Sequence, residues 1–208
     1  MLKSLYRGEQ LHRMGEEGAK KAALWLDSTA RFAISHNAYD LDPSTGEPLD
    51  HARLELLDGS WETFDLIGNI LDEKGKQGHR LYVECKNYST DGNQGKLYRE
   101  YLAVCYSAFH RRWKAVDAPP SMEFMWATTH PFAVSTWTEL RDLATIREAC
   151  EDETMAARLD DVPFDDDVGR ELAKRLWVSV VNDRADEMIM GSELFIAVKG
   201  KMIDLARA

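Results

Sequence analysis

The stretch LYVECKNYSTDGNQGKLYREY, residues 81–101, decides how the chain folds. Its first six residues alternate as a strand does, with Leu81, Val83 and Cys85 on one face. The other face carries Glu84 and Lys86, roughly 7 Å apart along the strand. A polar loop follows and leads into a long predicted helix. A buried strand with a charged pair on one face, leading into a helix, is therefore the feature that needs a physical explanation.

The flanking sequence alternates helical periodicity with short apolar runs, which predicts an α/β protein. The fold expected is a three-layer α/β/α core with a central mixed sheet over residues 1–137. A mostly helical, acidic extension with a short terminal strand is expected to pack on that core over residues 138–208. The predicted helices span residues 5–29, 94–114, 138–157 and 167–177, and the predicted strands span 31–35, 54–57, 63–71, 81–86, 122–128 and 193–198.

Composition and charge exclude several classes of protein. The net charge of −10 disfavours broad, nonspecific binding of nucleic acid. The charge is uneven, however, since residues 74–114 carry +6 and residues 139–171 carry −8. No apolar run is long enough to span a membrane and no signal peptide is evident, so we expect a cytoplasmic protein without membrane contact. The three cysteines are dispersed, which suits a reducing compartment and argues against a zinc or iron–sulfur site.

A second acidic residue, Asp65, is expected to lie beside the charged strand. Asp65 is the single carboxylate in an apolar run, and antiparallel pairing of its strand with residues 81–86 would bring it close to Glu84. Two adjacent carboxylates repel each other unless a cation lies between them, and their oxygens suit Mg²⁺. Lys86 beside such a site can hold or deprotonate a water, or stabilise charge on phosphorus oxygens. These three side chains are the groups that metal-assisted phosphodiester hydrolysis requires. The alternative interpretation is that this strand face is exposed and carries an incidental ion pair.

Asp65 followed by Glu84-Cys85-Lys86 resembles the PD-(D/E)xK signature of the restriction-endonuclease-like nuclease superfamily. The resemblance implies that Asp65 and Glu84 bind Mg²⁺, with Mn²⁺ as a substitute, and that the backbone carbonyl of Cys85 is a further ligand. It assigns Lys86 to the attacking water. The family usually has proline before the aspartate, where this chain has Phe64.

The predicted helix after the lysine carries a second resemblance. Gln94 and Tyr98 lie four residues apart and so share a helix face. They resemble the Gln-x-x-x-Tyr element of RecB/Cas4-like nucleases, which implies contact with substrate or support of the metal site. The alternative is an ordinary amide at a helix start and an interface tyrosine. Cas4-type enzymes hold an iron–sulfur cluster on four cysteines, so with three we expect no iron–sulfur cluster.

The first predicted helix carries a third resemblance. GEEGAKKAALWL, residues 15–26, resembles the first helix of Mrr-like and Holliday-junction-resolvase-like members, in which a helical glutamate completes the acidic site. Glu17 is the candidate and Glu16 the alternate, while the resolvase-like position falls on Ala19. The other interpretation is a solvated glutamate paired with a lysine three or four residues on. The resemblance covers about residues 10–130.

These features together predict a Mg²⁺-dependent endodeoxyribonuclease in phage defence, restriction or repair. Two alternatives stay open: an inactive nuclease-fold subunit that binds DNA or a protein partner, and a structure-specific RNA nuclease. The acidic extension suggests a homo-oligomer, a partner protein or an activating ligand, and its charge predicts that it stays off the DNA. The bases expected to flank the substrate groove are Lys96, Arg99, Arg111 and Arg112.

Overall fold

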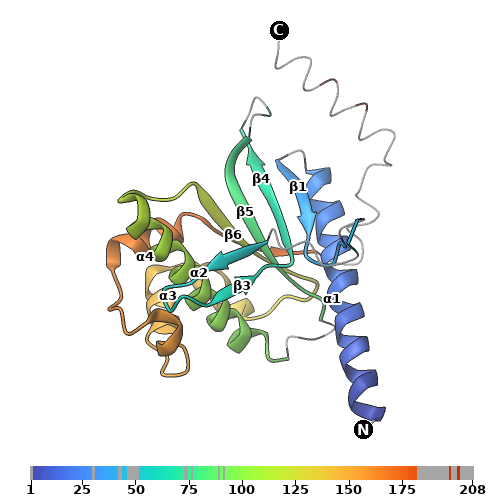
Figure 1. Cartoon of the computed structure of the whole chain (residues 1–208), viewed down its shortest axis with the longest axis horizontal. Helices are drawn as coiled ribbons and strands as arrows, with labels where there is room; N and C mark the ends of the chain where they lie inside the picture. Colours follow the sequence, from blue (N-terminus) through green and yellow to red (C-terminus); the bar gives the residue numbers. More distant parts are fainter. Residues whose placement is uncertain are drawn as a thin grey trace.

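A five-stranded mixed sheet forms the centre of the structure, with strand order β1-β4-β5-β6-β7 (Figure 1). The computed structural model describes residues 2–29, 31–41, 44–45, 52–72, 75, 77–88, 90, 92–181, 197 and 201. The strands are β1 Phe32–Asn37, β2 Arg53–Glu55, β3 Trp61–Thr63, β4 Leu66–Leu71, β5 Gln77–Lys86, β6 Met122–Thr128 and β7 Leu176–Val180. The helices are α1 Leu2–Ser28, α2 Gln94–Val116, α3 Leu143–Cys150 and α4 Asp166–Ala173, with 3₁₀ turns η1 Val134–Glu139 and η2 Ala156–Leu159.

Helices cover both faces of this sheet. On one face α1 packs Ala19, Ala22 and Leu26 against β4, β5 and β6. On the other face α2 packs against the sheet and is itself covered by α3 and α4. The β1, β4 and β5 strands pair antiparallel, whereas β5, β6 and β7 pair parallel. The predicted three-layer α/β/α fold with a mixed sheet is therefore confirmed.

The central strand β5 has the two faces that its alternation predicts. Leu81, Val83 and Cys85 lie in the core on the α1 side. Tyr82 lies in the core on the α2 side, where its ring centroid is 5.9 Å from that of Phe124. β5 lies at the centre of the sheet, paired with β4 on one side and with β6 on the other. The charged pair at its end is thus carried by the central strand of the sheet.

The predicted strand over residues 63–71 is interrupted. β3 ends at Thr63 and pairs with β2 as a separate two-stranded sheet, and β4 begins at Leu66. Phe64 causes the break, since its ring turns into the α2-side core against Tyr82 and its N–H donates to the Ala52 carbonyl at 2.9 Å. The expected single strand is wrong here because a tertiary contact overrides a continuous apolar pattern.

The segment after residue 137 is less helical than expected. The helix predicted over 167–177 ends at Ala173, and β7 then pairs parallel with β6 at the edge of the central sheet. This part of the extension completes the core sheet. The helix predicted over 138–157 is α3, flanked by the two 3₁₀ turns. The strand predicted over 193–198 lies almost wholly outside the described residues. No helix within the described ranges combines the length and the apolar character needed to cross a bilayer.

Gly68 allows β1 and β4 to lie against each other. A Cβ at this position would lie 2.5 Å from the carbonyl oxygen of Ala33 and 3.0 Å from the Cα of Ile34. By contrast, a Cβ at Gly95, in the first turn of α2, would meet nothing within 4 Å.

These two glycines should respond in opposite directions to alanine. Gly68→Ala forces the backbones of β1 and β4 apart, so it should lower the free energy of unfolding by about 2 kcal/mol. Gly95→Ala should raise it by up to about 1 kcal/mol, because alanine has the better helix propensity. Urea denaturation followed by circular dichroism would measure both. Equal effects of the two substitutions would contradict the close approach of β1 and β4.

Candidate active site

The structure brings Asp65 and Glu84 together at the end of the sheet. The β4–β5 register pairs Leu66 with Val83, so the next opposed pair in that register is Asp65 with Glu84. Directly opposed residues of antiparallel strands lie close together. The charge of Asp65 accordingly acts on the carboxyl group of Glu84. The register thus produces the two-carboxylate arrangement that the strand pairing predicts.

The carboxylate of Asp65 is held by two donors. Its Oδ2 accepts the backbone N–H of Cys85 at 2.7 Å, and its Oδ1 accepts the hydroxyl of Tyr39 at 3.0 Å. Because β4 begins only at Leu66, the Asp65 side chain occupies the place where a longer β4 would pair with β5. Tyr39 lies in the turn after β1, and sequence analysis missed it because no spacing or motif links it to Asp65.

Glu84 and Lys86 form the second part of the site. The Lys86 ammonium donates to Glu84 Oε1 at 2.6 Å, and the two side chains are 25% and 22% exposed. The same ammonium lies 5.5 Å from the centroid of the Trp126 ring. The end of β5 is fixed in turn, since the Thr129 N–H donates to the Lys86 carbonyl at 2.9 Å. The pair is therefore partly exposed to solvent, while the backbone that carries it is hydrogen-bonded.

Partial burial perturbs all three groups. Burial and the nearby charge of Asp65 raise the pKa of Glu84 to about 7, although Lys86 partly opposes them. Burial likewise raises the pKa of Asp65, against the lowering effect of its hydrogen bonds and of Lys86. Burial acts to lower the pKa of Lys86, but Glu84 and Asp65 outweigh it and the pKa is raised. The site is thus an acidic centre that gains from an added cation.

The donor set fits a hard divalent cation such as Mg²⁺. Asp65 and Glu84 supply carboxylate oxygens, and each bonded oxygen of Asp65 retains a second lone pair. The N–H and C=O of one strand residue point to the same side, so the Cys85 carbonyl points toward the edge where Asp65 lies. Within the described ranges, no group of three or more His, Cys, Asp or Glu side chains is arranged to hold a metal. A metal here would therefore depend on two carboxylates, the backbone carbonyl, water and substrate oxygens.

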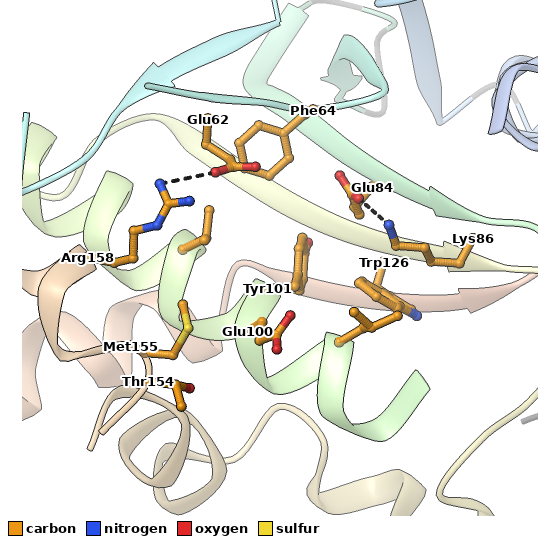
Figure 2. Close-up of a pocket in the computed structure, with 12 residues that line it drawn as sticks. Glu62, Phe64, Glu84, Lys86, Glu100, Tyr101, Trp126, Thr154, Met155 and Arg158 are labelled. Carbon is orange, nitrogen blue, oxygen red and sulfur yellow. Dashed lines mark hydrogen bonds and ion pairs between the residues drawn. The ribbon is translucent and has the colours of Figure 1, made fainter. Parts of the chain in front are cut away.

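Glu84 and Lys86 open into a pocket of about 360 Å³ between β5, β3 and α2 (Figure 2). Its floor includes the rings of Phe64, Tyr101 and Trp126. Its far side is formed by residues of the extension. The full lining consists of Glu62, Phe64, Glu84, Lys86, Leu97, Glu100, Tyr101, Val104, Trp126, Thr154, Met155 and Arg158.

The α1 helix lies close to the residues around the site because two of its positions are glycines. A Cβ at Gly15 would lie 2.4 Å from the Tyr39 hydroxyl, and one at Gly18 would lie 2.9 Å from Asn87 Cβ. Glu17 is exposed on this helix, and the structure records no contact between it and Asp65 or Glu84 among the described residues. Its predicted catalytic role stays a prediction.

Neighbouring residues of α1 have other surroundings. The alternate candidate Glu16 accepts a hydrogen bond from Lys20 at 2.6 Å, as the lysine-pairing interpretation expects. Ala19, at the resolvase-like position, is fully buried against the sheet.

Gln94 and Tyr98 lie inside the core. The Gln94 amide donates to the carbonyls of Thr90 and His130 and accepts from the Thr128 hydroxyl at 2.6 Å. The Tyr98 hydroxyl donates to the Leu140 carbonyl at 2.9 Å. Gln94 is 0% exposed and Tyr98 is 1% exposed. In this structure both side chains hold α2 in place, as the alternative interpretation expects, and their predicted contact with substrate or support of the metal site stays a prediction.

The four bases expected at the substrate groove divide into two pairs along α2. Lys96 and Arg99 are exposed near its first turns, where Lys96 lies 3.5 Å from Glu100. Arg111 and Arg112 are exposed at the opposite end, roughly 18 Å away along the helix axis. Arg111 donates to Glu55 at 2.8 Å. The site lies closer to the first pair, because α2 begins beside the ends of β5 and β6.

The raised pKa of Glu84 makes a prediction for the metal-free protein. Its folded-state pKa of about 7 exceeds the ordinary value of 4.5, so the folded protein binds the extra proton. The stability from this proton is present below pH 4.5 and is lost as pH rises through 7. In EDTA, Glu84→Gln should therefore gain about 2 kcal/mol of unfolding free energy relative to wild type between pH 5.5 and pH 8.

Chemical denaturation of both proteins across this pH range would measure the difference. Lys86 stays protonated throughout, and its attraction for the ionised form of Glu84 is already included in the pKa of about 7. A stability difference that is independent of pH would contradict the perturbed carboxyl group.

Comparison with known proteins identifies no family for this chain. No family model matches it, and no curated protein matches it. Among solved structures, a match is the Moraxella osloensis Cap4 SAVED/CARF-domain containing receptor, at 13% sequence identity and a TM-score of 0.34. The match covers 93% of this chain and 41% of that structure's chain, so this chain spans less than half of its length. The basis for a functional proposal is therefore the chain's own site.

Proposed function

We propose that the protein is a Mg²⁺-dependent nuclease that hydrolyses phosphodiester bonds in DNA. The observation that carries the proposal is the meeting of Asp65, Glu84 and Lys86 at one end of the sheet, with Glu84 and Lys86 open to a pocket. Two partly buried carboxylates in mutual repulsion weaken a fold unless they serve a cation. A lysine beside them suits a reaction in which negative charge grows on phosphate oxygens.

Each residue has a distinct task in this mechanism. Bound Mg²⁺ would polarise the phosphate and lower the pKa of a nucleophilic water. Asp65 and Glu84 would hold it, with the Asp65 oxygens oriented by Tyr39 and the Cys85 N–H. The Lys86 ammonium would exchange its bond with Glu84 for the attacking water or a phosphate oxygen. The water oxygen would bond to phosphorus and release one proton to solvent, while the bond from phosphorus to the leaving sugar oxygen breaks and that oxygen takes up a proton from solvent.

Active chemistry, rather than binding alone, accounts best for the residue types present. A binding surface for DNA needs cations, whereas this pocket presents three carboxylates and two cations. Carboxylates at a phosphate-binding site are useful when a metal ion joins them to the phosphate. The setting in phage defence, restriction or repair stays a prediction.

Substitution of the three residues should separate metal binding from cleavage. Asp65→Asn and Glu84→Gln remove ligand charge, so both Mg²⁺ affinity and DNA cleavage should fall, cleavage by a factor of about 10² or more. Lys86→Met keeps both carboxylates, so Mg²⁺ should still bind while cleavage falls by a similar factor. Calorimetric titration of the metal beside a plasmid-nicking assay would measure both quantities for each variant.

Glu148→Gln, an exposed carboxylate on α3, is the matched control and should behave as wild type. A parallel assay with an RNA substrate tests whether the protein cleaves DNA in preference to RNA. Wild-type cleavage that persists in excess EDTA, or full activity of Lys86→Met, would rule out this mechanism.

A further inference from the structure

The pocket that contains Glu84 and Lys86 has a second wall, built from the extension. Thr154, Met155 and Arg158 line it opposite β5, about 70 residues later in the chain than the charged strand (Figure 2). The acidic character of the extension predicts that this segment stays away from nucleic acid. The structure instead places an arginine from it in the same pocket as the candidate catalytic lysine.

This wall is a fixed part of the core. The Arg158 carbonyl accepts the Ser107 hydroxyl of α2 at 2.6 Å, and that hydroxyl oxygen accepts the Leu57 N–H at 2.9 Å. Ser107 is fully buried, and the flanking Met155 and Leu159 are 8% and 5% exposed. The backbone of Arg158, in η2, is therefore held by α2 and by the turn after β2. Its position does not depend on the Arg158 side chain.

The guanidinium group of Arg158 is held more loosely than its backbone. Its Nη1 donates to the Ser60 hydroxyl at 3.1 Å and lies 3.5 Å from Glu62 Oε2. Both contacts recorded within the described part of the chain use Nη1, so the rest of the guanidinium fork can take a bidentate partner. The side chain is 39% exposed, and such an ion pair is weak. Figure 2 shows this pair at one end of the pocket and the Glu84–Lys86 pair at the other.

We propose that Arg158 binds a backbone phosphate of the substrate, next to the phosphate cleaved at Lys86. The proposal rests on the proposed function, because it takes this pocket as the site of the nucleic acid. Arginine is the side chain best matched to two phosphate oxygens at once. Glu62 pairs only with Nη1, at one edge of that fork, and an incoming phosphate would replace it. The extension thus supplies a substrate-binding residue, and the core alone does not make a complete site.

Binding of a fluorescein-labelled 12-base-pair DNA in Ca²⁺, measured by anisotropy across salt concentrations, tests this role without any cleavage. Arg158→Ala should raise the Kd about tenfold and reduce the slope of log Kd against log salt by about one. Arg158→Lys keeps the charge but loses the fork, so its Kd should lie between those of wild type and Arg158→Ala. Arg170→Ala, an exposed arginine on α4 that pairs with Asp167, should bind as wild type does.

Glu62→Gln separates a phosphate contact from a structural ion pair. It breaks the same pair as Arg158→Ala, but it leaves the arginine in place and removes its competing carboxylate. If Arg158 binds phosphate, Glu62→Gln should tighten DNA binding about twofold to threefold. If the pair only supports the fold, both substitutions should weaken binding equally, which would overturn the proposal. Thermal unfolding of each variant would show whether the fold is retained.

The outcomes distinguish this proposal from the proposed function. Wild-type protein that binds DNA in Ca²⁺ but never cleaves it in Mg²⁺ would overturn the nuclease activity, while the Arg158 comparison would still be decided by Kd. Wild-type affinity and salt slope in Arg158→Ala would overturn the phosphate contact, even if cleavage is normal. The same binding measurement with a 12-base-pair RNA duplex shows whether the contact is specific to DNA. Failure of both nucleic acids to bind would overturn both proposals.

Discussion

The hydrogen bond from the Cys85 N–H to the Asp65 carboxylate is the interaction on which the site depends. It replaces a backbone pair between β4 and β5 with a side chain, at the point where β4 begins. The same bond orients the acid opposite Glu84 and leaves the end of β5 facing a pocket. Tyr39 holds Asp65 through its hydroxyl, and Gly15 of α1 lies against that hydroxyl. A single donor–acceptor pair thereby links strand register to the placement of charge.

This arrangement carries a cost in stability that the surrounding fold must offset. Two carboxylates and a lysine lie partly buried at one end of the sheet, and burial is the main reason that the pKa of Glu84 rises. The aromatic rings below them and the satisfied amide of Gln94 keep the backbone rigid. Rigid surroundings are what allow unfavourable charge placement to persist at a site.

Sequence alone was sufficient for the features that depend on local periodicity. The alternation in residues 81–86 gave the two faces of β5, and helical spacing gave α1 and α2 close to their observed limits. Sequence alone was insufficient where contacts between residues far apart in the chain determine the local structure. The break at Phe64 depends on the ring of Tyr82, and β7 becomes a strand because the edge of β6 is there to pair with it. Tyr39 and Arg158 reach the site through folding alone, so neither has a sequence signature.

The position of the second pocket wall has a consequence for synthesis on the ribosome. Residues 154–158 are translated about 70 residues after Lys86, which corresponds to roughly 4–14 s at ordinary elongation rates. Until they emerge, the pocket beside the charged end of β5 lacks its second wall. The growing chain therefore holds an incomplete cleft during most of its translation. A protein whose proposed activity is DNA cleavage thus has all the residues of its pocket translated before the last strand of its sheet, β7.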